Sequence, residues 1–317
     1  MNNITLFPEP TLTTLIEAFR PSNFIAPEVL ARIVSPTITG YFGRANASYL
    51  RIVDTVTKGN GQKNVVTYKL DRNKQYEVTD HDLENELTAG DAEKYGGWDA
   101  AKKTTNYMLG FQLMLSEESA VSTFLTTNTN YAGANTVALA GGDQWNIKTS
   151  EVLSKIKVAK DRVATTTGQE ANTIILGRDV FSALQFHPEI YSTLGFANKG
   201  PFGLLSTEQM AVALGVDRVL VGRAIYNSAK EAQTAVASTI WGKNAIVAYV
   251  AMDGTEMFDP GLGGRVVCPA QMQEMAVGSY IPEGKEANKV QMLKQTRAYD
   301  NVIVNINAAY LITTAVA

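Results

Sequence analysis

The chain has 317 residues, enough for about two domains or for one domain with large extensions. Hydrophobic residues make up 45% of it and charged residues 19%, which excludes a disordered chain, because disordered chains bury too little apolar surface to fold. With 28 Lys and Arg against 31 Asp and Glu, the formal net charge is −3, so charge provides no general attraction for phosphate. We therefore do not expect a protein that wraps DNA or coats RNA.

The sequence shows no pattern typical of export, membrane insertion or disulfide bonding. The first 20 residues lack a basic start followed by an apolar stretch and a small-residue cleavage site, and no later stretch offers about 18 uninterrupted apolar residues. Cys268 is the single cysteine, so it cannot form an internal disulfide. These features predict a soluble protein that is made in the cytoplasm and has no membrane partner.

Residues 1–36 carry five prolines and predict an N-terminal arm rather than one compact helix. Each proline removes an amide donor and favours extended geometry in the residue before it. The arm keeps large apolar side chains that need a surface to cover them, namely Leu15, Ile16, Phe19, Phe24, Ile25 and Leu30. That surface belongs either to a neighbouring molecule or, if the arm is a strap, to its own domain.

Two strand-like runs, at residues 49–56 and 64–70, flank a tip at residues 58–61 with the sequence Lys-Gly-Asn-Gly. Gly and Asn tolerate the positive φ angles of tight turns, so a long hairpin is expected. The stretch around it is locally positive through Arg44, Arg51, Lys58, Lys63, Lys69, Arg72 and Lys74. The next stretch is locally negative through Glu77, Asp80, Asp82, Glu84, Glu86, Asp91 and Glu93. Either both runs are solvated surface, or the positive loop of one chain aligns with the negative surface of an identical neighbour.

The best candidate for a long helix spans residues 98–126. Two glycines precede it, Asp99 suits its first turn, and a broad apolar face is expected from Ala101, Met108, Leu109, Phe111, Leu113 and Leu115. Residues 128–142 are rich in Gly, Asn and Thr and predict a loop at a domain boundary.

From residue 147 onward, helices and strands are expected to alternate. The predicted helices lie at residues 147–163, 179–184 and 207–214, and the predicted strands at 173–176, 218–221 and 240–250. This alternation predicts helices that cover a central sheet. Residues 302–312 predict one or two closing strands that return beside the long helix, so the α/β block would be inserted between two halves of an elongated domain.

No group of residues predicts catalysis or a bound ion. The stretch 261–265 lacks the Lys and Ser/Thr of a phosphate-binding loop and predicts a turn. Residues 80–86 lack the spacing of a calcium loop, which favours an acidic surface over a metal site. His81 and His187 are far apart, His187 suits a helix end, and the apolar neighbours of Cys268 predict an inert buried thiol. We therefore predict no cofactor, no metal and no enzymatic activity.

The order of arm, hairpin, long helix, α/β insertion and returning strands is accompanied by characteristic short stretches. They lie at residues 172–177, followed by Phe181 and Leu184, and at 187–190, 207–208, 214–216, 218–221, 224–227, 240–245 and 249–250. In order and spacing, they resemble the major capsid proteins of tailed bacteriophages, which have the HK97-type fold. The resemblance extends over nearly the whole chain.

The resemblance implies an α+β, HK97-like capsid fold. Residues 1–36 would form the N-terminal arm, 37–79 the extended loop, 80–146 a peripheral domain with the spine helix, 147–272 the inserted α/β axial domain and 273–317 returning strands of the peripheral domain. A projecting hairpin with little core of its own is marginally stable alone but gains burial when it lies across a neighbour.

The resemblance further implies a major capsid protein that assembles with itself, as pentamers and hexamers, into an icosahedral head shell. The shell would enclose double-stranded DNA without sequence-specific binding, and the implied partners are a scaffolding protein, a portal protein and a decoration protein. The implied location is the virion, after assembly in the host cytoplasm. Candidate residues for contacts between subunits are Phe19, Phe24, Arg51, Lys58, Asn60, Lys63, Glu84 and Glu86.

Two other functions stay open at this point. An encapsulin-like nanocompartment shell has the same fold and predicts an enzyme cargo, whereas a soluble hydrolase or transferase on the α/β block lacks a catalytic set. Some capsid relatives join a loop lysine covalently to an asparagine of a neighbour, but Lys58 and Lys63 are more simply explained as solvated or ion-paired. Because the arm begins at residue 1, a separate scaffolding protein or earlier cleavage is implied.

Overall fold

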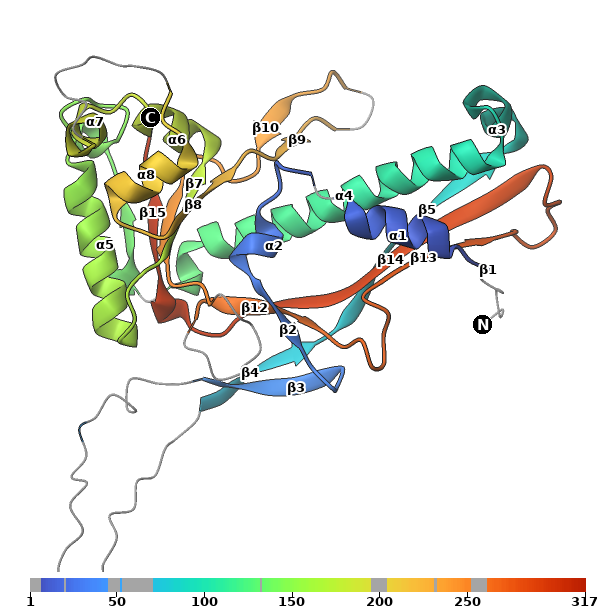
Figure 1. The fold of residues 1–317 in the computed structure, drawn as a ribbon, viewed down its shortest axis with the longest axis horizontal. Coiled ribbons are helices and arrows are strands. Elements are labelled where there is room, and N and C mark those ends of the chain that lie inside the picture. The colour runs from blue at the N-terminus through green and yellow to red at the C-terminus, as the bar shows by residue number, and fades with distance from the viewer. Residues whose placement is uncertain are drawn as a thin grey trace, which may run out of the picture.

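The structure is a computed structural model that describes residues 7–19, 21–44, 52, 71–131, 133–194, 204–230, 233–251 and 261–317. Two large sheets and one long helix dominate it (Figure 1). The predicted hairpin tip, with Lys58, Asn60 and Lys63, lies outside the described residues, as does Arg51. Among the described residues, no helix combines the length and the hydropathy needed to cross a lipid bilayer.

A six-stranded sheet joins the N-terminal and C-terminal parts of the chain. Its strands are β1 (Phe7–Pro8), β2 (Ala31–Val34), β5 (Thr79–Thr88), β12 (Gly263–Val267), β13 (Met275–Tyr280) and β14 (Val290–Ile303). The strand order is β1-β13-β14-β12-β2, and β5 also pairs with the long strand β14. All pairs are antiparallel except β12 with β2. A separate ribbon pairs β3 (Thr39–Arg44) with β4 (Asp71–Glu77).

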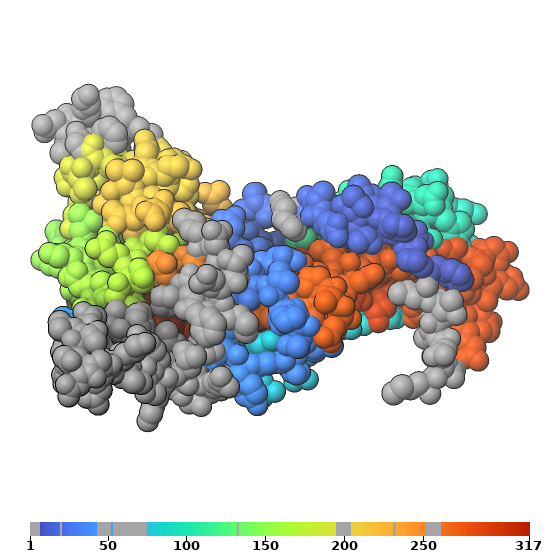
Figure 2. All heavy atoms as spheres, turned by 60° about the horizontal axis from the view of Figure 1, so that its bottom comes forward, coloured from blue at the N-terminus to red at the C-terminus, as the bar shows by residue number. Residues whose placement is uncertain are grey.

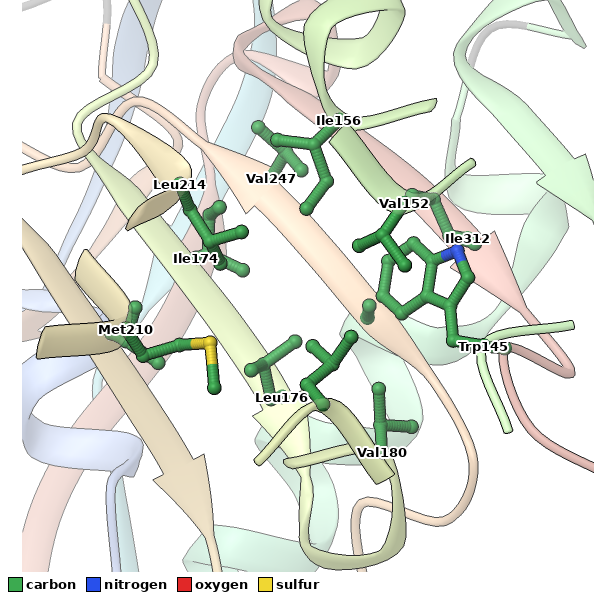
Figure 3. Packing of buried hydrophobic residues seen from close by; sticks show 14 of the residues in the cluster. Trp145, Val152, Ile156, Ile174, Leu176, Val180, Met210, Leu214, Val247 and Ile312 are labelled. Carbon is green, nitrogen blue, oxygen red and sulfur yellow. The ribbon is translucent and has the colours of Figure 1, made fainter. Parts of the chain in front are cut away.

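A five-stranded sheet with order β6-β15-β11-β7-β8 forms the α/β domain. Its strands are β6 (Thr136–Ala138), β7 (Thr173–Gly177), β8 (Arg218–Gly222), β11 (Ala245–Ala248) and β15 (Ala309–Thr313). The helices on one face are α5 (Val152–Thr167), α6 (Arg178–Leu184), α7 (Pro188–Thr193) and α8 (Thr207–Leu214). Figure 3 shows side chains from these helices and strands pointing toward one another, with Trp145 beside Val152 and Ile312. The prediction of helices over a central sheet is therefore confirmed.

The predicted long helix is confirmed as α4 (Trp98–Thr126), which follows the short helix α3 (Ala89–Tyr95). A buried residue occupies every fourth position from Ala101 to Leu125. Because a helix has about 3.6 residues per turn, each such step advances about 40° around the axis. The buried stripe therefore winds around α4, so one helix contacts α1, the six-stranded sheet and the α/β domain along its length.

The winding stripe corrects the predicted apolar face of α4. Leu109 and Leu113 are each 5% exposed, as expected for core residues. Met108 and Phe111, which were predicted on the same face, are 57% and 43% exposed. The sequence analysis assumed that the same face of the helix is buried from one end to the other. It therefore missed that the buried face rotates around the helix axis along α4.

We expect Leu109→Ala to lower the free energy of unfolding by about 2–5 kcal/mol, because it removes a buried side chain and leaves a cavity. Met108→Ala is expected to change it by about 0.5 kcal/mol or less, because that side chain lies at the surface. Urea denaturation of both variants measures the difference. Equal losses would show that the buried face has been assigned wrongly.

The described part of the arm lies on its own chain (dark blue in Figures 1 and 2). Helix α1 (Pro10–Ala18) buries Leu12 and Ile16 against α4 and the six-stranded sheet, and α2 (Ala26–Val29) packs between α4 and the five-stranded sheet. A Cβ at Gly110 of α4 would overlap the Ile16 side chain, so the close crossing of α1 and α4 requires glycine there. For these residues the structure supports a strap rather than an arm covered by a neighbour.

Neither sheet coincides with the predicted domain ranges. Strand β12 lies inside the range 147–272 but pairs in the six-stranded sheet, whereas β15 follows that range and pairs in the five-stranded sheet. The predicted loop at 128–142 contains β6, which also joins the five-stranded sheet. The packing of the returning strands beside α4 is confirmed, because both β14 and β15 contact that helix.

Several predicted elements differ in extent from those observed. The first helix of the α/β block is shifted to Val152–Thr167, and the strand expected at 240–250 shortens to Ala245–Ala248. The turn expected at 261–265 is largely strand β12. A Cβ at Gly263 would overlap the Val302 carbonyl, so these glycines allow two strands to approach closely and do not form a turn.

Candidate functional site

The residues considered for chemistry have structural roles. In the described part of the chain, no group of three or more His, Cys, Asp or Glu side chains is placed to hold a metal ion. His187 is 2% exposed, and its Nε2 lies 3.2 Å from Ser150 Oγ and 3.1 Å from the Ile147 carbonyl, so it ties α7 to the segment before α5. Cys268 is a free buried thiol, as predicted.

The acidic run predicted from the sequence is an edge strand. Successive side chains of β5 point to opposite faces, so the four carboxylates of Asp80, Asp82, Glu84 and Glu86 share one face of the sheet, and we name them the acidic row. Lys294 of β14 forms ion pairs with two of them, at 3.7 Å from Glu84 Oε1 and in closer contact with Asp82. The row therefore keeps a net negative charge on an open face.

Tyr280 also contacts the acidic row, because its hydroxyl donates to Glu84 Oε2 at 2.7 Å. This hydrogen bond, together with burial, raises the pKa of Tyr280 to about 12. Among the described residues, β5 pairs with β14 alone, so its other edge is open. Charged side chains on an edge strand discourage pairing between two identical strands.

The centre of α4 carries a buried ionic cluster on the side of the six-stranded sheet. Glu117 is 2% exposed and lies 2.9 Å from Arg297 Nη1 and 3.4 Å from Arg265 Nε. Arg265 in turn lies 4.0 Å from Glu274, which pairs with Arg32 of β2 at 2.7 Å. The cluster thus connects α4 with β14, β12 and the arm.

Within the cluster, burial alone would raise the pKa of Glu274, but the hydrogen bond from Arg32 and the charges of Arg32, Arg265 and Arg297 outweigh it and lower that pKa. The guanidinium of Arg265 also lies over the ring of Tyr299, 4.7 Å from its centroid. Such a cation–ring contact adds stabilisation when the pair is shielded from water.

The neighbouring residue, Glu118, is about 100° further around the helix and connects α4 with the arm and the α/β domain. It is fully buried, and its carboxylate accepts hydrogen bonds from the amides of Ile25 and Ala26, at 2.8–3.1 Å. It also accepts one from Trp241 Nε1 at 2.6 Å. Two adjacent glutamates therefore hold both large sheets and the arm on a single helix.

Burial raises the pKa of Glu118 above its ordinary value of 4.5; the hydrogen bonds from Trp241, Ala26 and Ile25 oppose this, and the charge of Glu117 adds to it. A carboxyl group whose pKa is higher in the folded state binds its proton more tightly there. Its contribution to stability is therefore present below pH 4.5 and is lost as the pH rises through the folded-state value.

We accordingly expect the wild type to lose unfolding free energy relative to Glu118→Gln as the pH rises from 4 to 7. Glutamine keeps the shape and one acceptor oxygen but does not titrate, so the difference isolates this group. Urea denaturation at several pH values measures it. A difference that moves the other way would mean that the hydrogen bonds outweigh burial.

Apolar side chains are exposed at two places where the sequence analysis predicted no exposed apolar surface. Tyr107, Met108 and Phe111 lie on α4, while Ile225, Tyr226 and Val236 belong to a ribbon of β9 (Ile225–Asn227) and β10 (Ala237–Thr239). Phe186, Leu204 and Val212 of the α/β domain are exposed as well. A signal for the first place was available, since residues 104–116 contain no charged side chain.

The predicted contact residues fall into three groups. Glu84 and Glu86 are exposed on β5, and the other charged or polar candidates, Arg51, Lys58, Asn60 and Lys63, lie outside the described residues. Phe19 is partly buried, with its ring 5.5 Å from that of Tyr107. Phe24 is 9% exposed and packs against Met114 and Ala224, so its own chain leaves it little surface for a neighbour.

Comparison with known proteins shows relatives among phage proteins. No protein-family model matches the chain. The chain is 23% identical over 205 residues to a protein of Burkholderia phage BcepMu named major capsid protein, a match that covers 63% of this chain and 62% of that relative. It is 26% identical over 255 residues to the major capsid protein of Pseudomonas phage JBD67, covering 78% of this chain and 79% of the relative.

Solved structures show the same fold over almost the full length. A phage-related protein from Bordetella bronchiseptica matches with a TM-score of 0.73 at 17% identity, covering 98% of each chain. A chain of the capsid structure of cyanophage P-SCSP1u matches with a TM-score of 0.57 at 10% identity, covering 93% of this chain and 89% of that one. A chain of an encapsulin complex from Synechococcus elongatus matches with a TM-score of 0.52 at 9% identity, covering 93% of this chain and 88% of that one. The predicted HK97-like capsid fold is therefore confirmed.

Proposed function

We propose that this chain, a relative of phage major capsid proteins, is itself a capsid protein whose copies assemble into a closed shell. The observation that carries the proposal is the match to the Pseudomonas phage capsid protein, which extends over 78% of this chain and 79% of that protein. The fold supports it independently, because chains of an encapsulin complex and of a phage capsid each match 93% of this chain.

The finer steps of the proposal concern partners and location. Copies associate as pentamers and hexamers of an icosahedral head, with a scaffolding and a portal protein as partners in the host cytoplasm and a decoration protein on the shell. Many modest contacts between identical chains add up to a stable shell while each stays weak enough for errors to be corrected. A net charge of −3 suits a shell that encloses DNA without gripping it. We assign the chain no enzymatic activity.

The acidic row is our candidate for one of these contacts. The opposite charge is available on the same chain, since Arg51, Lys58 and Lys63 belong to the locally positive stretch, with Asn60 at its tip. In a shell, the positive stretch of one copy lies against the acidic row of the next. Charge complementarity of this kind guides association and sets its register.

We expect Glu86→Lys to lower the yield of assembled particles about tenfold at low salt, because a small loss at each contact is multiplied over the many contacts of a shell. The unfolding midpoint should not change, since Glu86 is exposed. Electron microscopy and sedimentation measure the yield. Glu170→Lys, an equally charged change at an exposed site of the α/β domain, is the control; equal effects of both variants would exclude the acidic row as the contact.

Electron microscopy of the purified protein, alone and with a scaffolding protein from the same genome, tests the function itself. We expect uniform closed particles. A chain that stays monomeric under all conditions and turns over a substrate would instead be an enzyme. Particles that are filled with one co-purified enzyme, and not with DNA during infection, would identify an encapsulin-like compartment.

A further inference from the structure

The middle of α4 exposes an uncharged surface that the described residues cover only in part, with the Phe19 ring beside Tyr107 and the Phe24 ring beside Phe111. Residues 104–116 carry no charge, although charged residues make up 19% of the chain. Tyr107, Met108 and Phe111 are 40%, 57% and 43% exposed, and we name these three residues the α4 stripe. Phe111 lies four residues after Tyr107 and three after Met108, so both side chains neighbour it on the helix surface. An exposed apolar stripe of this kind is typical of an interaction surface.

A second uncharged surface lies on the β9–β10 ribbon. Among the described residues, these two strands pair only with each other. Tyr226 is opposite Ser238, and the Ser228 amide donates to the Val236 carbonyl, so all four side chains share one face, which we name the ribbon face. Tyr226 and Val236 are 43% and 54% exposed. A two-stranded ribbon is marginally stable in water and gains from a partner that covers it.

The chain's own α4 does not provide that cover. The base of the ribbon contacts α4 through Ala224 and Ile240, which pack near Met114 and Leu115. Beyond this base the ribbon extends away as a separate element (Figure 1), and the side chains of Tyr226 and Val236 stay exposed. Among the described residues, both surfaces therefore stay partly exposed within one copy.

We propose that the ribbon face of one copy docks on the α4 stripe of a second copy, an inference that rests on the proposed shell function. Charge favours this pairing. Neither surface carries a charged group, so docking one on the other buries no unpaired ion. The aromatic rings and the flexible Met108 side chain are suited to the centre of an interface.

The two surfaces differ from each other, so the contact is head to tail. A head-to-tail contact between identical copies closes into rings when the rotation between neighbours divides a full turn. The described part of the chain thus carries both halves of a ring contact. The contact is separate from the acidic row, which lies on β5 and depends on charge.

A paired charge experiment tests the contact. Met108→Glu and Val236→Lys each place one charge in the interface, and each is expected to lower the particle yield at least about tenfold. The two changes together place opposite charges side by side, so the double variant is expected to recover a yield within about twofold of the wild type. Val158→Glu on α5 is the matched control, because Val158 is 56% exposed and Met108 is 57% exposed.

Yield is measured by electron microscopy and sedimentation, and the unfolding midpoint shows that each variant is folded. If Val236→Lys lowers the midpoint, Tyr226→Lys takes its place. Single variants that assemble like the wild type, or a double variant that does not recover, overturn the contact while the shell function stands; the second result would point to a partner of different sequence. A wild type that forms no particles under any condition overturns the shell function, and the contact with it.

Discussion

Replacing Glu117 by alanine is expected to lower the free energy of unfolding by about 3–5 kcal/mol, because it removes the carboxylate that two buried arginines share. Arg297 is 3% exposed and Arg265 is 8% exposed, so the change leaves two guanidinium groups largely shielded from bulk water. Glu274 compensates little, since it lies 4.0 Å from Arg265 and already pairs with Arg32. Urea denaturation measures the loss.

Glu286→Ala is the matched control for Glu117→Ala. It makes the same chemical change in an ion pair with Lys289, at 3.0 Å, where both side chains are about two-thirds exposed. An exposed pair of this kind contributes about 0.5 kcal/mol or less. A loss below about 1 kcal/mol for Glu117→Ala would show that the cluster relaxes or admits water, and that burial does not set its strength.

The helices were predictable where local signals agree with packing. Helix α8 begins with a capping box between Ser206 and Gln209 and ends at Gly215, whose φ of 63° suits glycine, and the sequence predicted its limits correctly. Strands β7 and β8 were recognisable from their β-branched residues, whereas β12 was predicted as a turn, and no strand's partners were predictable. Whether β12 and β15 join one sheet or the other depends on contacts with distant parts of the chain, which no local pattern encodes.

Much less of the candidate site was predictable. The sequence shows the charges of Glu84 and Glu86. That both side chains lie on the same face follows only once β5 is known to be a strand, in which every second residue points to the same side. Glu117 and Glu118 read as ordinary polar positions of a helix, and nothing local reveals that the partner of Glu117 is Arg297, 180 residues away. Met108 was expected in the core because the rotation of the buried stripe along α4 results from tertiary packing.

The position of these glutamates explains why α4 can act as a spine. Its buried stripe contacts α1 and the six-stranded sheet at one end and the α/β domain at the other. At its centre, Glu117 faces the six-stranded sheet and Glu118 faces α2 and Trp241. One helix therefore holds the six-stranded sheet, the arm and the α/β domain together.

Trp145→Ala is expected to lower the free energy of unfolding by about 3–5 kcal/mol, as a buried aromatic side chain is lost from the core of the α/β domain. Trp145 is 1% exposed and lies beside Val152 and Ile312 (Figure 3), and its amide donates to the Ala315 carbonyl at 2.7 Å. The alanine variant keeps that backbone hydrogen bond, so the expected loss comes from the side chain's packing in the core that also contains Ala315 and Val316.

Trp145→Phe separates the contribution of volume from that of the indole N–H. The indole nitrogen is buried and has no hydrogen-bond partner among the described residues, so phenylalanine removes an unpaired donor while it keeps most of the apolar volume. We therefore expect Trp145→Phe to lower the free energy of unfolding by less than half as much as Trp145→Ala does. Urea denaturation of both variants measures the difference. Equal losses would mean that the indole nitrogen has a partner, such as a buried water, and that packing alone does not explain why tryptophan occupies this position.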